Sequence, residues 1–150
     1  MKRLLSSLLI LTMLLCVFPV QGSAVEKKLE TVYFDDGSYM TVEIITRGTR
    51  ASGSTSGSKP YTYYDSTGSA QWKATISGSF TYNGSSATCT SSSVDVTIYD
   101  SAWYTISKSA SKSGNTASAS VTMGEKRGGV TVNRVPVSLS LSCDRNGNLS

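Results

Sequence analysis

A strict alternation of apolar and polar side chains along residues 72–82 constrains the fold more than any other feature of this chain. Apolar or small residues occupy every second position from Trp72 to Tyr82, and lysine, serine and threonine fill the positions between them. A period of two places these sets on opposite faces of a β-strand. The segment therefore predicts a long antiparallel strand that covers a core with one face and meets water with the other.

Turn residues interrupt similar alternations along the rest of the chain. Asp36-Gly37 and Asn83-Gly84 are dipeptides typical of β-hairpin turns, and Asp65–Gly68 also has turn chemistry. No segment shows helical periodicity. The pattern predicts an all-β fold, an antiparallel β-sandwich of immunoglobulin-like architecture with about eight or nine short strands. A slip in the alternation near Asn133-Arg134 predicts a bulge, and Pro136 favours an edge strand.

Turn lengths predict which residues face each other. A two-residue loop at Asn83-Gly84 pairs Gly78 with Cys89, and the missing side chain of Gly78 leaves room there for a disulfide. By the same reasoning, a four-residue loop after Tyr64 places Tyr63 opposite Ala70.

The N-terminal segment, residues 1–24, has the parts of a secretory signal peptide. Lys2 and Arg3 form a basic start, residues 4–20 are uncharged and mostly apolar, and small residues precede the expected cleavage site between Ala24 and Val25. We therefore expect a secreted, extracellular protein with no membrane span after cleavage. An uncleaved membrane anchor is the alternative.

Two cysteines remain once the signal peptide, which contains Cys16, is removed. An exported protein with two cysteines has one intramolecular pairing available. We expect a Cys89–Cys143 disulfide that closes a loop of about 55 residues and contributes about 4 kcal/mol in the chain-entropy model. Two free, buried thiols are the alternative.

Composition divides the mature chain into three parts. Residues 25–46 predict an N-terminal β-hairpin, residues 47–60 a Ser/Gly-rich linker or long loop, and residues 61–150 the β-sandwich body. The hairpin could dock on the body, be removed as a propeptide or form an edge for self-association. Docking is favoured because an isolated hairpin is marginally stable in water.

Charge and residue types exclude several functions. The net charge of +4 includes Lys2 and Arg3, so the mature chain carries +2, and its scattered charges argue against nucleic acid. The chain has no histidine, which excludes Ser-His-Asp and Cys-His catalysis and histidine metal sites. We predict no catalytic residue, no metal ligand and no cofactor.

A carboxylate pair for glycoside hydrolysis is the enzymatic alternative. Its candidates are Asp35, Asp36, Glu43, Asp65, Asp95, Asp100 and Glu125. Most of them lie in turns, where aspartate is expected to bond to the local backbone.

Aromatic residues provide the candidate surface site. Trp103 and Tyr104 are adjacent, so in a strand one faces the core and the other faces outward, and Tyr64 likewise opposes Tyr61 and Tyr63. An exposed aromatic ring on a sandwich can stack on a sugar or anchor a protein. Tyr64 and Tyr104 are therefore the candidate surface-binding residues, and packing of the rings beneath a loop is the structural alternative.

Several strand and turn segments of this chain resemble small exported proteins of Gram-positive bacteria. They are Tyr61–Tyr63, Trp72, Phe80–Ser85, Cys89-Thr90, Trp103, Ser107–Asn115 and Leu141–Cys143. The resemblance implies secretion and a disulfide-bearing β fold, and it implies no activity.

These observations together favour a non-enzymatic extracellular or cell-surface binding module. Its expected partner is a cell wall or glycan surface, or an extracellular protein. An exported antimicrobial or toxin-like protein, processed near the linker, is the alternative function.

Overall fold

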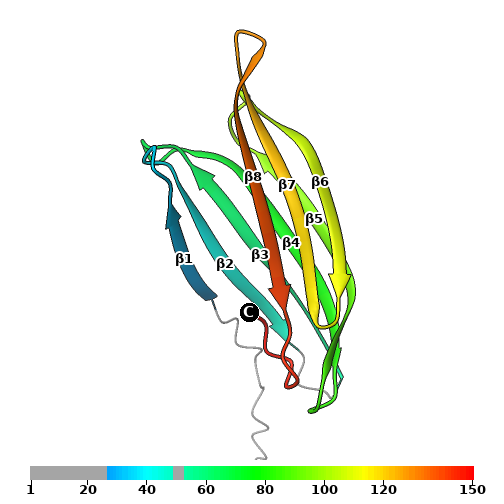
Figure 1. Cartoon of the computed structure of the whole chain (residues 1–150). Helices are drawn as coiled ribbons and strands as arrows, with labels where there is room; N and C mark the ends of the chain where they lie inside the picture. The colour runs from blue at the N-terminus through cyan, green and yellow to red at the C-terminus, as the bar shows by residue number, and fades with distance from the viewer. Residues whose placement is uncertain (1–26, 49–52) are drawn as a thin grey trace, which may run out of the picture.

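The computed structural model describes residues 27–48 and 53–150, which form two antiparallel sheets (Figure 1). The strands are β1 (Lys27–Tyr33), β2 (Tyr39–Gly48), β3 (Ser54–Tyr64), β4 (Ala70–Tyr82), β5 (Ala87–Ile98), β6 (Trp103–Ser113), β7 (Thr116–Arg127) and β8 (Val130–Ser142). The predicted all-β sandwich is confirmed. Within the described ranges no helix is long and apolar enough to cross a bilayer.

The two sheets are connected as a meander. Strands β1 to β5 form one sheet in chain order, and β6 to β8 form the other, so the chain changes sheet only between β5 and β6. Immunoglobulin domains instead use Greek-key connections. The likeness to them is therefore one of two packed sheets and does not extend to strand order.

The N-terminal hairpin is part of the five-stranded sheet. β1 and β2 turn at Asp36-Gly37, where Gly37 has a φ of 81°, and β2 pairs with β3. The hairpin is therefore docked, as favoured. The expected linker is wrong for residues 54–60, because they belong to β3, where all of them pair with β4 and residues 55–58 also pair with β2. The signal peptide, the Ala24–Val25 site and residues 49–52 lie outside the described residues.

The core lies between the two sheets, and the alternation along β4 is confirmed. Trp72, Ala74, Ile76 and Phe80 are each 0 or 1% exposed. The opposite sheet contributes further buried side chains, which include Ala117, Val121, Met123, Leu139 and Leu141. Burial of each large apolar side chain contributes about 1.5–3 kcal/mol, so this layer provides most of the drive for folding.

Both predicted pairings are wrong, because the loops are longer than expected. Cys89 lies opposite Phe80, and Gly78 lies opposite Ser92, with a register shift between Ser79 and Phe80. The side-chain oxygen of Asn83 accepts hydrogen bonds from the backbone N–H groups of Ser85 at 3.0 Å and Ser86 at 2.8 Å. These bonds favour a loop of four residues.

Next to the β3–β4 loop, Tyr64 pairs with Ala70. Tyr63 pairs with Trp72, because the register shifts between Tyr63 and Tyr64. The carboxylate of Asp65 accepts hydrogen bonds from the backbone of Thr67 and Ser69, both at 2.9 Å, which widens this loop to residues 65–69.

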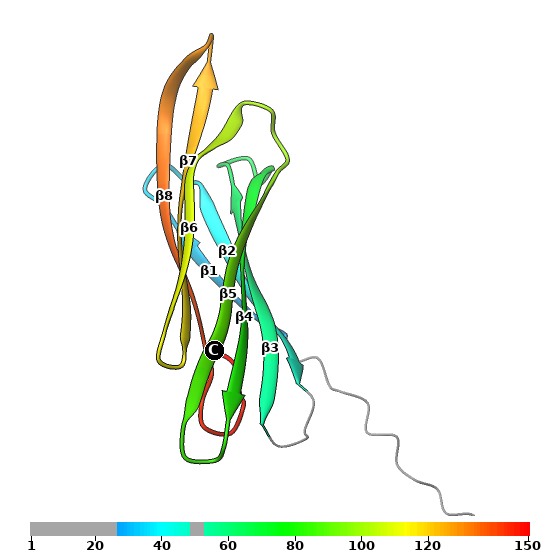
Figure 2. The ribbon, with the colours of Figure 1, turned by 90° about the vertical axis from the view of Figure 1, so that its right-hand side faces the viewer.

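One end of the sandwich, which we call the loop end, carries the β1–β2, β3–β4, β5–β6 and β7–β8 loops (Figures 1 and 2). The β7–β8 hairpin extends beyond the other three loops there. A register shift between Glu125 and Lys126 lies opposite Thr131 and Asn133, so the predicted bulge is confirmed close to its expected position. β8 is an edge strand, as Pro136 indicated.

Candidate functional site

A pocket of about 390 Å³ opens at the loop end between the two sheets. Its walls come from all four loops: Asp36 from the first, Asp65 from the second, Asp100 from the third and Glu125 from the β7–β8 hairpin. The pocket therefore gathers four of the seven carboxylates that the sequence offered as candidates. Their separation along the chain gave no sign of this arrangement.

The floor of the pocket is aromatic and rigidly held. Tyr63 and Trp103 are 4% and 6% exposed. The Tyr63 ring stacks on Trp72 at 5.1 Å between centroids and meets the Trp103 ring edge-on at 5.4 Å. Gln71 joins floor to rim, because its amide nitrogen donates to the Asp65 carboxylate at 2.9 Å and its oxygen accepts from Trp103 Nε1 at 3.1 Å.

Each carboxylate of the rim already has a hydrogen-bond partner. Asp36 accepts from the backbone and hydroxyl of Ser38, and Asp100 accepts from the backbone of Ala102 at 2.7 Å. Glu125 accepts from the Arg127 guanidinium at 2.8 Å. These bonds fix the carboxylates in place and leave further acceptor positions free on their oxygens.

Two of the pocket's carboxylates, Asp36 and Asp65, have lowered pKa values. The Ser38 hydroxyl holds the pKa of Asp36 below 3.8, and the Thr67 hydroxyl does the same for Asp65. A general acid for glycoside hydrolysis needs a raised pKa instead. Burial, followed by the charges of Asp36, Glu125 and Asp65, raises the pKa of Tyr63, against an opposing hydrogen bond with Ser38. The pocket is therefore electronegative, and Tyr63 keeps its proton.

Tyr64 belongs to a row of three tyrosines on the outer face of the five-stranded sheet. Tyr33, Tyr39 and Tyr64 are cross-strand partners on β1, β2 and β3. The ring centroids of Tyr39 and Tyr64 are 4.8 Å apart with planes at 9°, and those of Tyr33 and Tyr39 are 5.7 Å apart at 42°. Tyr33, on the edge strand, is 75% exposed.

Sequence reasoning found Tyr64 and missed Tyr33 and Tyr39. The missed signal is that the latter two flank the Asp36-Gly37 turn at positions that pair when the hairpin closes. Neighbouring strands lie about 4.8 Å apart, so the row spans about 10 Å at the loop end.

Tyr104, the other candidate, lies on the three-stranded sheet and is not part of the pocket or the tyrosine row. Its ring covers Gly124, where an added Cβ would lie 2.7 Å from ring atoms. Its hydroxyl is 2.6 Å from Thr131 Oγ1, and the Lys126 ammonium is 4.4 Å from the ring centroid. The Tyr104 ring is therefore occupied by contacts within its own sheet. Tyr64 lies on the other sheet, so the two tyrosines do not form one site.

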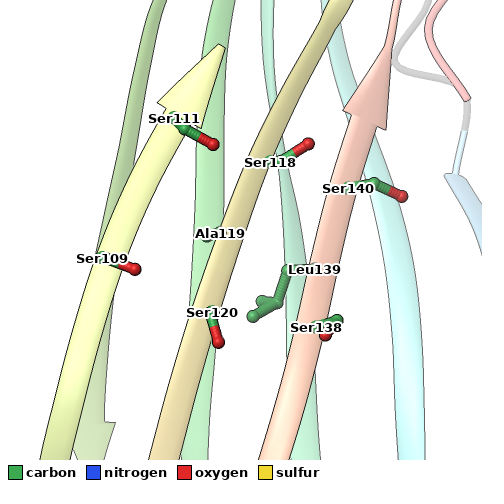
Figure 3. Close-up of a pocket in the computed structure, with 8 residues that line it drawn as sticks. All are labelled: Ser109, Ser111, Ser118, Ala119, Ser120, Ser138, Leu139 and Ser140. Atoms are coloured by element: carbon green, nitrogen blue, oxygen red, sulfur yellow. The ribbon is translucent and has the colours of Figure 1, made fainter. Parts of the chain in front are cut away.

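Rows of serines cover the outer faces of both sheets. Figure 3 shows six of them in a shallow depression on β6, β7 and β8: Ser109, Ser111, Ser118, Ser120, Ser138 and Ser140. A second depression has Ser56, Ser58, Ser77, Ser79, Ser91 and Ser93 on β3, β4 and β5. A serine nucleophile needs an adjacent base, and neither lining contains a titratable side chain. These serines are the polar outer positions of the strands.

Cys89 and Cys143 lie at the opposite end of the sandwich, against the β6–β7 turn. The Cys89 N–H donates to the carbonyl of Gly114 at 2.7 Å, and the Cys143 N–H donates to that of Asn115 at 3.0 Å. Both residues are buried free thiols, so the expected disulfide is not present in the structure. The space expected beside Gly78 is filled by the Phe80 ring, and Cys89 lies opposite Phe80.

The two thiols are nevertheless neighbours. Burial raises the pKa of each thiol, and the charge of a Cys89 thiolate further raises the pKa of Cys143. Among the described residues, no group of three or more His, Cys, Asp or Glu side chains could hold a metal ion.

Comparison with known proteins found no matching family model, no matching curated protein and no matching solved structure.

Proposed function

We propose that this protein is a secreted, non-enzymatic binding module that recognises cell-wall or other surface glycans through its loop end. The observation that carries the proposal is the row of Tyr33, Tyr39 and Tyr64 on the outer face of the sheet. Tyrosine is a side chain that binding surfaces use because it combines an apolar ring with a polar hydroxyl.

The row suits a sugar chain in two ways. The ring of Tyr33 presents a free face at the sheet edge, where the C–H face of a sugar can stack. The hydroxyl groups of the row offer acceptors for sugar hydroxyls. A site about 10 Å long that combines stacking with hydrogen bonds fits a short stretch of polysaccharide.

Binding is favoured over hydrolysis by the state of the carboxylates. Asp36 and Asp65 have lowered pKa values, and Glu125 is paired with Arg127. Asp36 and Asp65 are therefore set up to accept hydrogen bonds and not to deliver a proton to a leaving group.

Export and a Cys89–Cys143 disulfide are the other parts of the proposal. After export, the two neighbouring thiols lose two protons and two electrons to a disulfide oxidant, which is reduced to two thiols while the new S–S bond forms. The bond would link β5 to the end of β8 across the sandwich. Protein from culture supernatant should then be about 2 Da lighter than its reduced form and should resist thiol alkylation until reduced.

The glycan proposal is tested by co-sedimentation of the secreted protein with purified bacterial cell walls and insoluble polysaccharides. Tyr33→Ala and Tyr64→Ala should each weaken binding about fivefold to tenfold through lost ring contact. Leu29→Ala is the matched control, because Leu29 is an exposed apolar residue on the same edge strand, 61% exposed, and lies away from the row.

Unfolding curves establish that the variants are folded, since Tyr33 contributes little to the core. Retained binding in both tyrosine variants, or an equal loss in Leu29→Ala, would contradict the proposed site. Absence of binding to every matrix would contradict the glycan function.

A further inference from the structure

The β7–β8 hairpin forms a second exposed surface, separate from the tyrosine row. It extends beyond the other loops at the loop end (Figures 1 and 2). Residues 126–134 contain Lys126, Arg127 and Arg134 and no carboxylate. The same segment exposes two aliphatic side chains, Val130 at 65% and Val132 at 53%.

The cations are distributed over both faces of the hairpin. Arg134 is the cross-strand partner of Gly124, the residue that the Tyr104 ring covers, and the Lys126 ammonium lies over that ring at 4.4 Å. Lys126 and Arg134 therefore lie on the Tyr104 side. Arg127 bonds to Glu125 at 2.8 Å yet keeps its side chain 76% exposed. Glu125 is 14% exposed and, within the described part of the chain, pairs with Arg127 alone. It therefore offsets part of the positive charge of Arg127 and leaves the charges of Lys126 and Arg134 unchanged.

The turn itself is compact. Gly128 and Gly129 form it with φ values of 58° and 83°, so the two turn residues have no side chains, and Val130 follows directly. Lys126 and Arg127 pair with Thr131 and Val130, which satisfies backbone groups next to the turn. A hairpin with paired backbone groups can enter the headgroup region at little cost in broken hydrogen bonds.

We propose that the β7–β8 hairpin docks this protein on the surface of an anionic lipid bilayer. The cations would lie among the lipid phosphates, and Val130 and Val132 would enter the boundary with the acyl chains. Exposed aliphatic side chains next to cations distinguish a bilayer from a soluble polyanion, which offers no apolar layer to receive them. Tyr104, half-buried at the base of the hairpin, has the amphipathic ring typical of the membrane interface.

The test is vesicle co-sedimentation of the secreted protein, with equal parts phosphatidylglycerol and phosphatidylcholine, and with phosphatidylcholine alone. We expect binding to the anionic vesicles only, weakened by salt. Lys126→Gln with Arg134→Gln should weaken it about 25-fold, at about fivefold for each cation near the surface. Val130→Ser with Val132→Ser should weaken it about tenfold, and this loss should persist at high salt.

Lys73→Gln with Lys108→Gln is the matched control, since it removes the same charge from strands β4 and β6, away from the tip. The tip variants should retain wild-type unfolding curves and glycan binding, so failure of this proposal is distinct from failure of the glycan site. No binding to anionic vesicles, or an equal loss in the control, would overturn the proposal. So would binding to a soluble polyglycerol phosphate that depends on the cations and not on the valines.

Discussion

The indole nitrogen of Trp103 on β6 donates to the side-chain oxygen of Gln71 on β4 at 3.1 Å, in a buried hydrogen bond that joins the two sheets. Gln71 in turn donates to Asp65, so one side chain connects the core, the opposite sheet and the rim of the pocket. By contrast, the indole nitrogen of Trp72, which packs beside Trp103, is buried without a partner. The two tryptophans thus differ in what their nitrogens contribute.

This difference predicts unequal effects of the same substitution. Trp103→Phe leaves the Gln71 oxygen without its donor, whereas Trp72→Phe breaks no hydrogen bond. We expect Trp103→Phe to lower the free energy of unfolding by about 1–2 kcal/mol more than the loss of ring volume alone accounts for. Urea denaturation of both variants measures the difference. A double-mutant cycle with Gln71→Leu should show coupling, and additive effects would contradict the role of this bond.

Gly78 is predicted to tolerate no side chain. An added Cβ would lie 2.8 Å from the Phe80 ring and 3.1 Å from the Cβ of Ala117 on the opposite sheet. Gly78→Ala should therefore push the sheets apart and cost about 1–3 kcal/mol of stability, as overpacked cores do. Ser77→Ala, on the outer face of the same strand, is the control and should be close to neutral. A stable Gly78→Ala protein would show that the sheets can separate freely here.

Acid should destabilise the fold through its loop aspartates. Hydrogen bonds from Thr67 and Asn148 hold the pKa values of Asp65 and Asp144 below 3.8. A carboxyl with a lower pKa in the folded state stabilises the fold above its unfolded pKa, and this contribution is lost as pH falls through the folded pKa. Asp65→Asn should thus be less stable at neutral pH and should lose less stability between about pH 4 and 2.

Urea unfolding at a series of pH values checks that expectation. Ser77→Ala, on the outer face of β4, removes no carboxyl group and is the control that should follow the wild-type profile. A profile for Asp65→Asn parallel to that of the wild type would mean that this carboxyl does not control acid stability.

The C-terminal segment should contribute to stability through Leu149. Its side chain packs against the core and lies over Gly57, where an added Cβ would clash with Leu149 Cδ1. The backbones of Ser142 and Ser150 also exchange two hydrogen bonds, at 2.9 and 3.0 Å. Leu149→Ala should lower stability by about 1–2 kcal/mol in thermal or urea unfolding. Val130→Ala, an exposed aliphatic control, should have little effect, and equal stabilities would place Leu149 outside the core.

Local patterns predicted the elements, while side-chain bonds in the loops decided their pairing. The alternation along β4 follows from residues 72–82 alone, because one strand with one buried face shows in its own sequence. The offsets between strands depend on Asp65 and Asn83, whose side chains bond to the loop backbone and lengthen both turns. The sequence of residues 54–60, taken by itself, is typical of a linker. These residues form a strand because β3 lies between β2 and β4 and pairs with both.

The all-β class, the inward face of β4, the Asp36-Gly37 hairpin and the edge position of Pro136 could be predicted from the sequence, since each depends on neighbouring residues. The pocket, by contrast, depends on how the two sheets pack together. Asp36, Asp65 and Glu125 meet because a meander returns alternate loops to the same end of the sandwich. Contacts between residues so far apart in the chain form only when both sheets close over a common core, and no local pattern of side chains encodes them.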